Sequence, residues 1–123
     1  RLIDTANAPI FGVDKDLKVT EWNQAAVSIS GYTKEETLEK HLVNNFIAPD
    51  YKQSVTSVLQ DALQGKETAN YQFPLFTKSG QRVEILLNAT TRRDFTGTAV
   101  GVVGVGQDIT KLLAEFSYKL SKF

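Results

Sequence analysis

The chain has 123 residues, enough for one domain with a hydrophobic core of its own. Its 14 basic residues balance its 14 acidic ones, so no long-range field would attract nucleic acid or an anionic membrane, and we expect no direct nucleic-acid binding. Cysteine is absent, which excludes disulfides, thiolate catalysis and thiolate metal ligands.

No run reaches the roughly 18 apolar residues needed to cross a bilayer, and the first residues lack the pattern of a signal peptide. We therefore expect a cytoplasmic chain with no membrane span. The sequence starts without Met and stops within a helical pattern. From this we expect a piece of a longer protein, with an output domain elsewhere in the same chain.

The first elements are predicted to be a short helix and a hairpin. Residues 1–9 are interpreted as a leading helix segment, which Pro9 stops because proline disfavours helical geometry in the residue before it. Residues 10–13 and 18–22 are rich in β-forming side chains and flank a polar turn. They predict two antiparallel strands.

Helices are predicted to follow this hairpin. Asn23 is a good N-cap for a helix that ends at Gly31, a residue that readily adopts left-handed geometry. Thr33 and Glu36 have the spacing of a capping box, which predicts a second short helix. Residues 50–63 place apolar side chains on one stripe and predict a longer helix.

From residue 69 the apolar period changes to two. Residues 69–75, 83–89 and 99–105 predict three consecutive antiparallel strands, because the turns between them are too short for a parallel crossover. The order of two strands, several helices and three strands predicts an α+β fold, with helices on one side of an antiparallel sheet.

Five segments together resemble the PAS (Per-Arnt-Sim) family of sensor domains. They are NAPIFGVD (7–14), EWNQAA (21–26), SGYTKEE (30–36), TKSG (77–80) and GVGQDIT (104–110). The resemblance implies a five-stranded antiparallel sheet with helices over one face, forming a core over residues 10–110. It also implies a C-terminal signalling helix over 111–123, the start of a linker or coiled coil. In some members of the family the core holds a ligand or chromophore.

Light-oxygen-voltage flavoproteins form a subgroup of that family, and the sequence departs from their flavin positions. The resemblance puts the photoactive cysteine at Leu42, two flavin-binding amides at Leu75 and Ile85, and a strand glutamine at Gly106. These replacements disfavour a flavin with a cysteinyl photoadduct. Haem is disfavoured as well, because His41 is the only histidine and precedes the long helix. The cofactor stays unknown, and we expect none.

Strand alternation predicts an interior of apolar or small side chains. The candidates for lining a cavity there are Phe11, Val13, Leu42, Leu75, Ile85, Leu87, Val102, Gly104 and Gly106. One interpretation is a fully packed core. The other is a cavity opened by the missing side-chain volume at Ala89, Gly104 and Gly106. Its rim would then have polar candidates, namely Tyr32, Asn44, Asn45 and Tyr71.

The opposite face of the sheet is also apolar, so something is expected to cover it. Its members are Ile10, Leu86, Val103 and Val105. The leading helix, the C-terminal helix or a second copy in a homodimer are the candidates. The C-terminal segment has a short seam of Leu113, Phe116, Leu120 and Phe123. This seam fits a helix packed on its own sheet as well as a coiled coil.

Residues 107–110 join the last strand to this helix and are the candidates for signal relay: Gln107, Asp108, Ile109 and Thr110. Thr110 is expected to cap the helix. The leading hypothesis is a sensory or regulatory module of a larger signal-transduction protein, which relays a ligand- or partner-dependent change in its sheet to the helix. The alternative is a ligand-free dimerisation module. No nucleophile and base can be paired in the interior, so we expect no enzyme.

Overall fold

The structure is a computed structural model that describes residues 8–122, so most of the predicted leading helix and Phe123 lie outside the described residues. Strands and helices follow one another as the sequence predicts, with one additional helix. The elements are β1 (Ile10–Asp14), β2 (Val19–Trp22), α1 (Gln24–Ser30), α2 (Lys34–Thr37), α3 (Leu42–Phe46), η2 (Pro49–Tyr51), α4 (Lys52–Leu63), β3 (Thr68–Phe76), β4 (Arg82–Arg93), β5 (Ala99–Asp108) and α5 (Thr110–Ser121).

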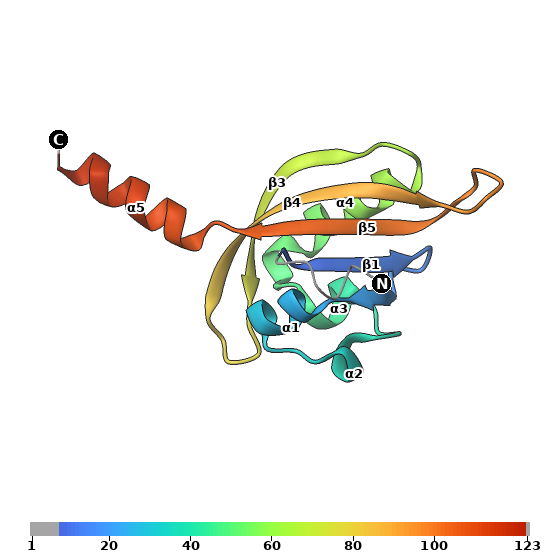
Figure 1. The fold of residues 1–123 in the computed structure, drawn as a ribbon, viewed down its shortest axis with the longest axis horizontal. Coiled ribbons are helices and arrows are strands. Elements are labelled where there is room, and N and C mark those ends of the chain that lie inside the picture. The colour runs from blue at the N-terminus through green and yellow to red at the C-terminus, as the bar shows by residue number, and fades with distance from the viewer. Residues whose placement is uncertain (1–7, 123) are drawn as a thin grey trace.

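The strands form one five-stranded sheet in the order β2-β1-β5-β4-β3, with every neighbouring pair antiparallel. The first and last strands of the chain therefore pair in the middle and join the N-terminal hairpin to the three C-terminal strands. Helices α1 to α4 lie over one face of the sheet, and α5 extends away from the body of the domain (Figure 1). The predicted α+β fold is confirmed.

Local hydrogen bonds explain where the first two helices begin. Asn23 Oδ1 accepts from the Ala26 amide at 2.9 Å, and Gly31 ends α1 with a φ of 79°. Thr33 Oγ1 accepts from the Glu36 amide at 3.2 Å, while Glu36 Oε1 accepts from the Thr33 amide at 3.0 Å. Both predicted caps are confirmed.

The stretch before α4 differs from the prediction. Helix α3 was not expected, because five residues are too few to show a helical period. His41 caps it, with Nδ1 accepting from the Asn44 amide at 3.1 Å. The long helix begins at Lys52 rather than at residue 50, since Pro49 starts a separate turn of 3₁₀ helix.

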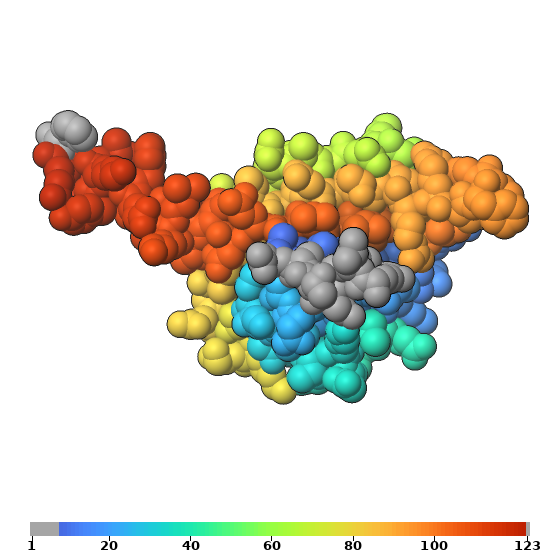
Figure 2. Space-filling view, viewed as in Figure 1, coloured from blue at the N-terminus to red at the C-terminus, as the bar shows by residue number. Residues whose placement is uncertain are grey.

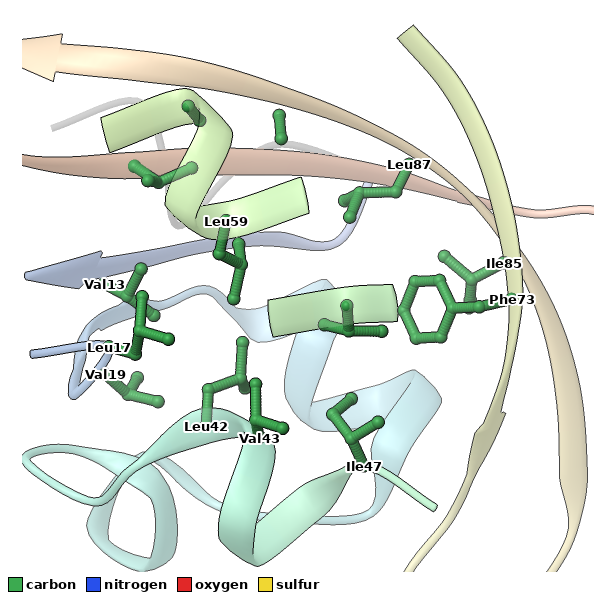
Figure 3. Close-up of a cluster of buried hydrophobic side chains, with 14 of the residues drawn as sticks. Val13, Leu17, Val19, Leu42, Val43, Ile47, Leu59, Phe73, Ile85 and Leu87 are labelled. Carbon is green, nitrogen blue, oxygen red and sulfur yellow. The ribbon is translucent and has the colours of Figure 1, made fainter. Parts of the chain in front are cut away.

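The core lies between the sheet and the helices. Its largest fully buried apolar side chains are Leu59, Leu87, Val13, Val19, Val43, Val55 and Val102. In Figure 3, Phe73 and Ile85 extend from the sheet toward the side of the core where Ile47 lies. The core therefore draws on most of the elements, and the sheet and helices stabilise one another.

The turn between β3 and β4 is fastened to the helical layer. The Lys78 amide donates to the Ser30 carbonyl at 2.9 Å, and Lys78 Nζ pairs with Glu36 Oε2 at 2.5 Å. The hydrogen bond from Lys78, followed by the one from the Thr33 amide, lowers the pKa of Glu36 from 4.5 to about 2. The β3–β4 turn is thereby joined to both α1 and α2.

The Glu36–Lys78 pair predicts a specific acid sensitivity. Because the folded pKa is below the unfolded one, the pair stabilises the fold above pH 4.5 and loses that effect as the pH falls toward about 2. We expect Lys78→Met to flatten the change in Tm between about pH 5 and pH 2. The exposed Lys66→Met variant is the control and should follow the unmodified protein. Equal acid slopes for all three proteins would contradict the assignment.

The outer sheet face and α5 do not cover each other. Val105 is 38% exposed on the sheet, while Phe116 and Leu120 on α5 are 60% and 57% exposed. The interpretation of α5 as packed on its own sheet is wrong, because the helix points away from the strand ends (Figure 2). Of the C-terminal seam residues that the structure describes, only Leu113 is half-buried. Within residues 8–122, no helix is long and apolar enough to span a membrane.

Candidate functional site: a core cavity beside a helix junction

A small cavity of about 60 Å³ remains between the sheet and the helices. All five strands contribute to it, as do helices α1, α3 and α4. Its lining residues are Pro9, Phe11, Trp22, Ala26, Ile29, Ser30, Leu42, Ile47, Val55, Phe73, Leu75, Ile85, Leu87 and Gly106. The core is therefore neither fully packed nor hollow enough for a large ligand.

The polar groups at the cavity wall are already paired within the protein. Trp22 Nε1 donates to the Tyr32 carbonyl at 3.0 Å. Ser30 Oγ donates to the Ala26 carbonyl at 2.6 Å. The Pro9 carbonyl accepts from the Gly106 amide at 2.8 Å. The space itself is consequently apolar.

The structure places the predicted cavity residues in two groups. The first group lines the cavity: Phe11, Leu42, Leu75, Ile85, Leu87 and Gly106. The second group is buried but does not line it: Val13, Val102 and Gly104. Strand alternation identifies the inward face correctly but does not say where along the strand packing is incomplete.

Gly104 does not open the cavity as predicted. Phe11 is its partner across the β1–β5 pair, and a side chain on Gly104 would overlap the Phe11 ring. The aromatic ring thus fills the volume that the glycine leaves free. Ala89 is fully buried and also lies off the cavity. Of the three small residues, Gly106 alone borders the space.

The predicted polar rim is also wrong, because none of its four members lines the cavity. Tyr71 pairs with Ser54 through their hydroxyls at 2.6 Å. Asn45 Nδ2 donates to the His41 carbonyl at 2.8 Å. Tyr32 stacks edge-on against Phe46, and Asn44 is exposed. The side chains of Tyr71, Asn45 and Tyr32 thus contact other parts of the protein rather than the cavity.

Sequence reasoning missed several wall residues outside the three C-terminal strands, including Trp22, Ala26, Ile47 and Val55. Val55 lies on the apolar stripe of α4, so its burial was predictable. The other three come from β2, from a short helix and from a connection. No periodic pattern there distinguishes a cavity wall from ordinary core.

The junction between β5 and α5 is held against β4 at Glu84. The Ile109 amide donates to the Glu84 carbonyl at 2.9 Å, and Thr110 Oγ1 accepts from the Glu84 amide at 2.8 Å. Asp108 Oδ1 accepts from the Thr110 amide at 3.0 Å. Ile109 is buried, whereas Gln107 is exposed.

Thr110 therefore does not cap α5 as predicted. The cap position is Ile109, which has no side chain able to accept a hydrogen bond, and Thr110 is already the first helical residue. Its hydroxyl faces β4 instead. The segment predicted for signal relay thus binds the neighbouring strand as well as starting the helix.

The cavity and the junction share two strands. Gly106 pairs with Leu87, and Asp108 pairs with Ile85. Both β4 residues line the cavity, and Glu84 directly precedes Ile85. The cavity wall and the anchor of α5 therefore share strand β4.

The wall lacks the side-chain groups to which the resemblance assigns flavin contacts. Leu42, Leu75, Ile85 and Gly106, the positions to which the resemblance assigns flavin contacts, all line the cavity but offer no side-chain amide or thiol. Pockets for cofactors and drug-sized ligands measure roughly 300–1,000 Å³. Within residues 8–122, no cluster of three acidic or histidine side chains is placed to hold a metal.

Comparison with known proteins supports the family assignment. A family model described as the PAS fold matches residues 1–109. The chain belongs to the PAS fold family. The PAS domain of a protein from Colwellia psychrerythraea has a TM-score of 0.78 at 24% identity, covering 89% of this chain and 92% of that one. An RNA-binding light-oxygen-voltage receptor has a TM-score of 0.77 at 17% identity, covering 100% of this chain and 36% of that one. These structural similarities show the fold alone.

Plant phytochromes are similar to this PAS domain in sequence. Phytochrome B1 of Solanum lycopersicum is 40% identical over 114 residues, which cover 89% of this chain and 10% of that protein. Phytochrome B of Oryza sativa subsp. indica is 39% identical, also over 114 residues that cover 89% of this chain and 10% of that protein. The PAS domain thus spans about a tenth of the length of these curated relatives.

Proposed function

We propose that this PAS domain is a non-catalytic sensory or regulatory module of a larger cytoplasmic signalling protein. It relays a change in its core to α5 through the junction at Glu84. The similarity to phytochromes, in which the matched region is about a tenth of the protein, supports a modular role. An output domain in the same chain would receive the signal.

One observation carries the proposal. The start of α5 is hydrogen-bonded to β4, a strand that lines the cavity, and is not held only by its chain connection to β5. The two hydrogen bonds between β4 and residues 109–110 are both made at Glu84. A shift in β4 therefore moves or releases the first turn of α5. Because α5 leaves the domain at this point, a change in the direction of the helix would be passed directly to the next domain.

We also propose that the relay works without flavin or haem. The apolar wall and the volume of about 60 Å³ support this, since a flavin edge needs polar partners that these side chains lack. The position of His41 supports it too. This residue caps α3 through Nδ1 and is not among the residues that line the cavity.

Dimerisation through the outer sheet face is the second candidate. Ile10, Leu86 and Val103 are half-buried there beside the more exposed Val105. A groove of about 520 Å³ crosses this face over Leu86, Asn88 and Val105. A second copy would remove these apolar side chains from water.

Two variants of the intact protein separate the candidates. Relay predicts that Thr110→Val changes signalling output roughly fivefold, the population shift expected from one lost hydrogen bond, while oligomeric mass stays constant. Thr110→Ser keeps the hydroxyl and should preserve output. The dimerisation candidate predicts instead that Val105→Glu abolishes both dimer and output, and that Thr110→Val has no effect. Light scattering and the output assay measure both quantities.

A further inference from the structure

We propose that the core cavity is a binding site for small apolar molecules that lack hydrogen-bonding groups, of the size of a xenon atom, dioxygen or a short hydrocarbon. Binding itself follows from the cavity, whereas any effect of binding on α5 rests on the proposed function. The argument uses the size of the cavity, the chemistry of its wall and its position.

The volume sets an upper limit on the ligand. A water molecule needs about 10–15 Å³ of such space, and an engineered apolar cavity of about 150 Å³ in another protein binds benzene or xenon. At about 60 Å³, this cavity lies between these values. It accommodates a ligand of a few heavy atoms and excludes an aromatic ring.

The wall decides the chemistry of that ligand. A buried water needs two to four polar partners. The polar groups of Trp22, Ser30 and Pro9 that border the cavity are bonded to protein atoms, and no described residue of the wall carries a charge. A water molecule in the cavity would therefore find few hydrogen-bond partners. An apolar molecule would gain dispersion contacts with the surrounding side chains, and its apolar surface would be removed from water.

Small side chains maintain the space. Ala26 and Gly106 face it from α1 and β5. A Cβ on Gly106 would lie 3.3 Å from both Ile85 Cγ2 and Pro9 Cγ, so even one methyl group there would occupy the cavity edge. A ligand would contact Leu87 and Ile85 on β4, and Ile85 directly follows Glu84, the residue that anchors α5.

The test uses xenon as the probe. The chain has one tryptophan, and Trp22 lines the cavity, so its fluorescence reports occupancy directly. We expect xenon to quench Trp22 saturably and to shift the methyl NMR signals of Leu42 and Leu87. Methanol, of similar size but polar, and benzene, which is too large, should produce neither saturable effect.

A matched pair of variants on α4 localises the site. Val55 lines the cavity, whereas the half-buried Val58 does not. Val55→Ile fills part of the space and should weaken xenon binding by about tenfold or more, while Val58→Ile should leave it within about twofold. Equal weakening in both, or no saturable binding to the unmodified protein, would overturn the site.

Amide exchange at Glu84 separates this proposal from the relay. If xenon binds at the cavity and slows or speeds exchange of that amide, both proposals stand. If xenon binds and exchange at Glu84 is unchanged, the site stands and its coupling to α5 fails. If xenon does not bind, the site fails, and the variants of Thr110 still test the relay on their own.

Discussion

Replacing Asn23 with alanine is expected to lower the free energy of unfolding by about 3 kcal/mol. The Asn23 side chain is fully buried and joins three segments. Its Oδ1 accepts from the amides of Ile10 and Ala26, both at 2.9 Å, and its Nδ2 donates to the Ala8 carbonyl at 2.8 Å. Alanine would leave these backbone groups without that partner and would remove the cap of α1.

Urea unfolding measures the effect, and Thr33→Ala is the matched control. Thr33 is also an N-cap with a hydrogen bond three residues ahead, but it is exposed. Its loss should cost about 1 kcal/mol, the ordinary value of a cap. The difference between the two variants therefore reports burial and the links to β1. Similar losses for both would show that Asn23 is only a local cap.

Disrupting the junction is expected to free α5 without unfolding the domain. Thr110→Val removes the acceptor for the Glu84 amide while keeping the shape of the side chain. Asp108→Ala removes the acceptor for the Thr110 amide. One net hydrogen bond contributes about 1 kcal/mol, so we expect the Glu84 amide to exchange roughly fivefold faster in Thr110→Val.

Conservative variants keep this experiment interpretable. Thr110→Ser and Asp108→Asn retain an oxygen acceptor and should keep slow exchange at Glu84 and Thr110. The amide of Leu87, on the same strand but within the core, should exchange equally in all variants. Faster exchange throughout β4 would indicate unfolding rather than release of the helix, and unchanged exchange at Glu84 would refute the anchor.

The features that sequence predicts well are those encoded over short distances. Asn23 and Thr33 each cap a helix through a bond to the residue three positions ahead. Inward and outward residues alternate along β4, so Leu87 and Leu86 were placed on the correct faces. Such local chemistry was enough for the order of the elements and for the resemblance to PAS domains.

The site was harder to predict because it depends on contacts between distant segments. The Phe11 ring comes from the opposite end of the sequence to fill the space beside Gly104, and it thereby reverses the expected role of that glycine. Thr110 binds Glu84 across a separation of 26 residues. In both cases the residue type was informative, but its partner could not be read from periodicity.

Spin-label distance measurements test the central claim, that residues 108–110 hold α5 in a fixed direction from the sheet. The chain lacks cysteine, so Gln72→Cys on β3 and Lys119→Cys on α5 give two unique labelling sites, both exposed. We predict a narrow distance distribution in this background that stays narrow with Thr110→Ser and broadens with Thr110→Val. A distribution that Thr110→Val leaves unchanged would contradict the account.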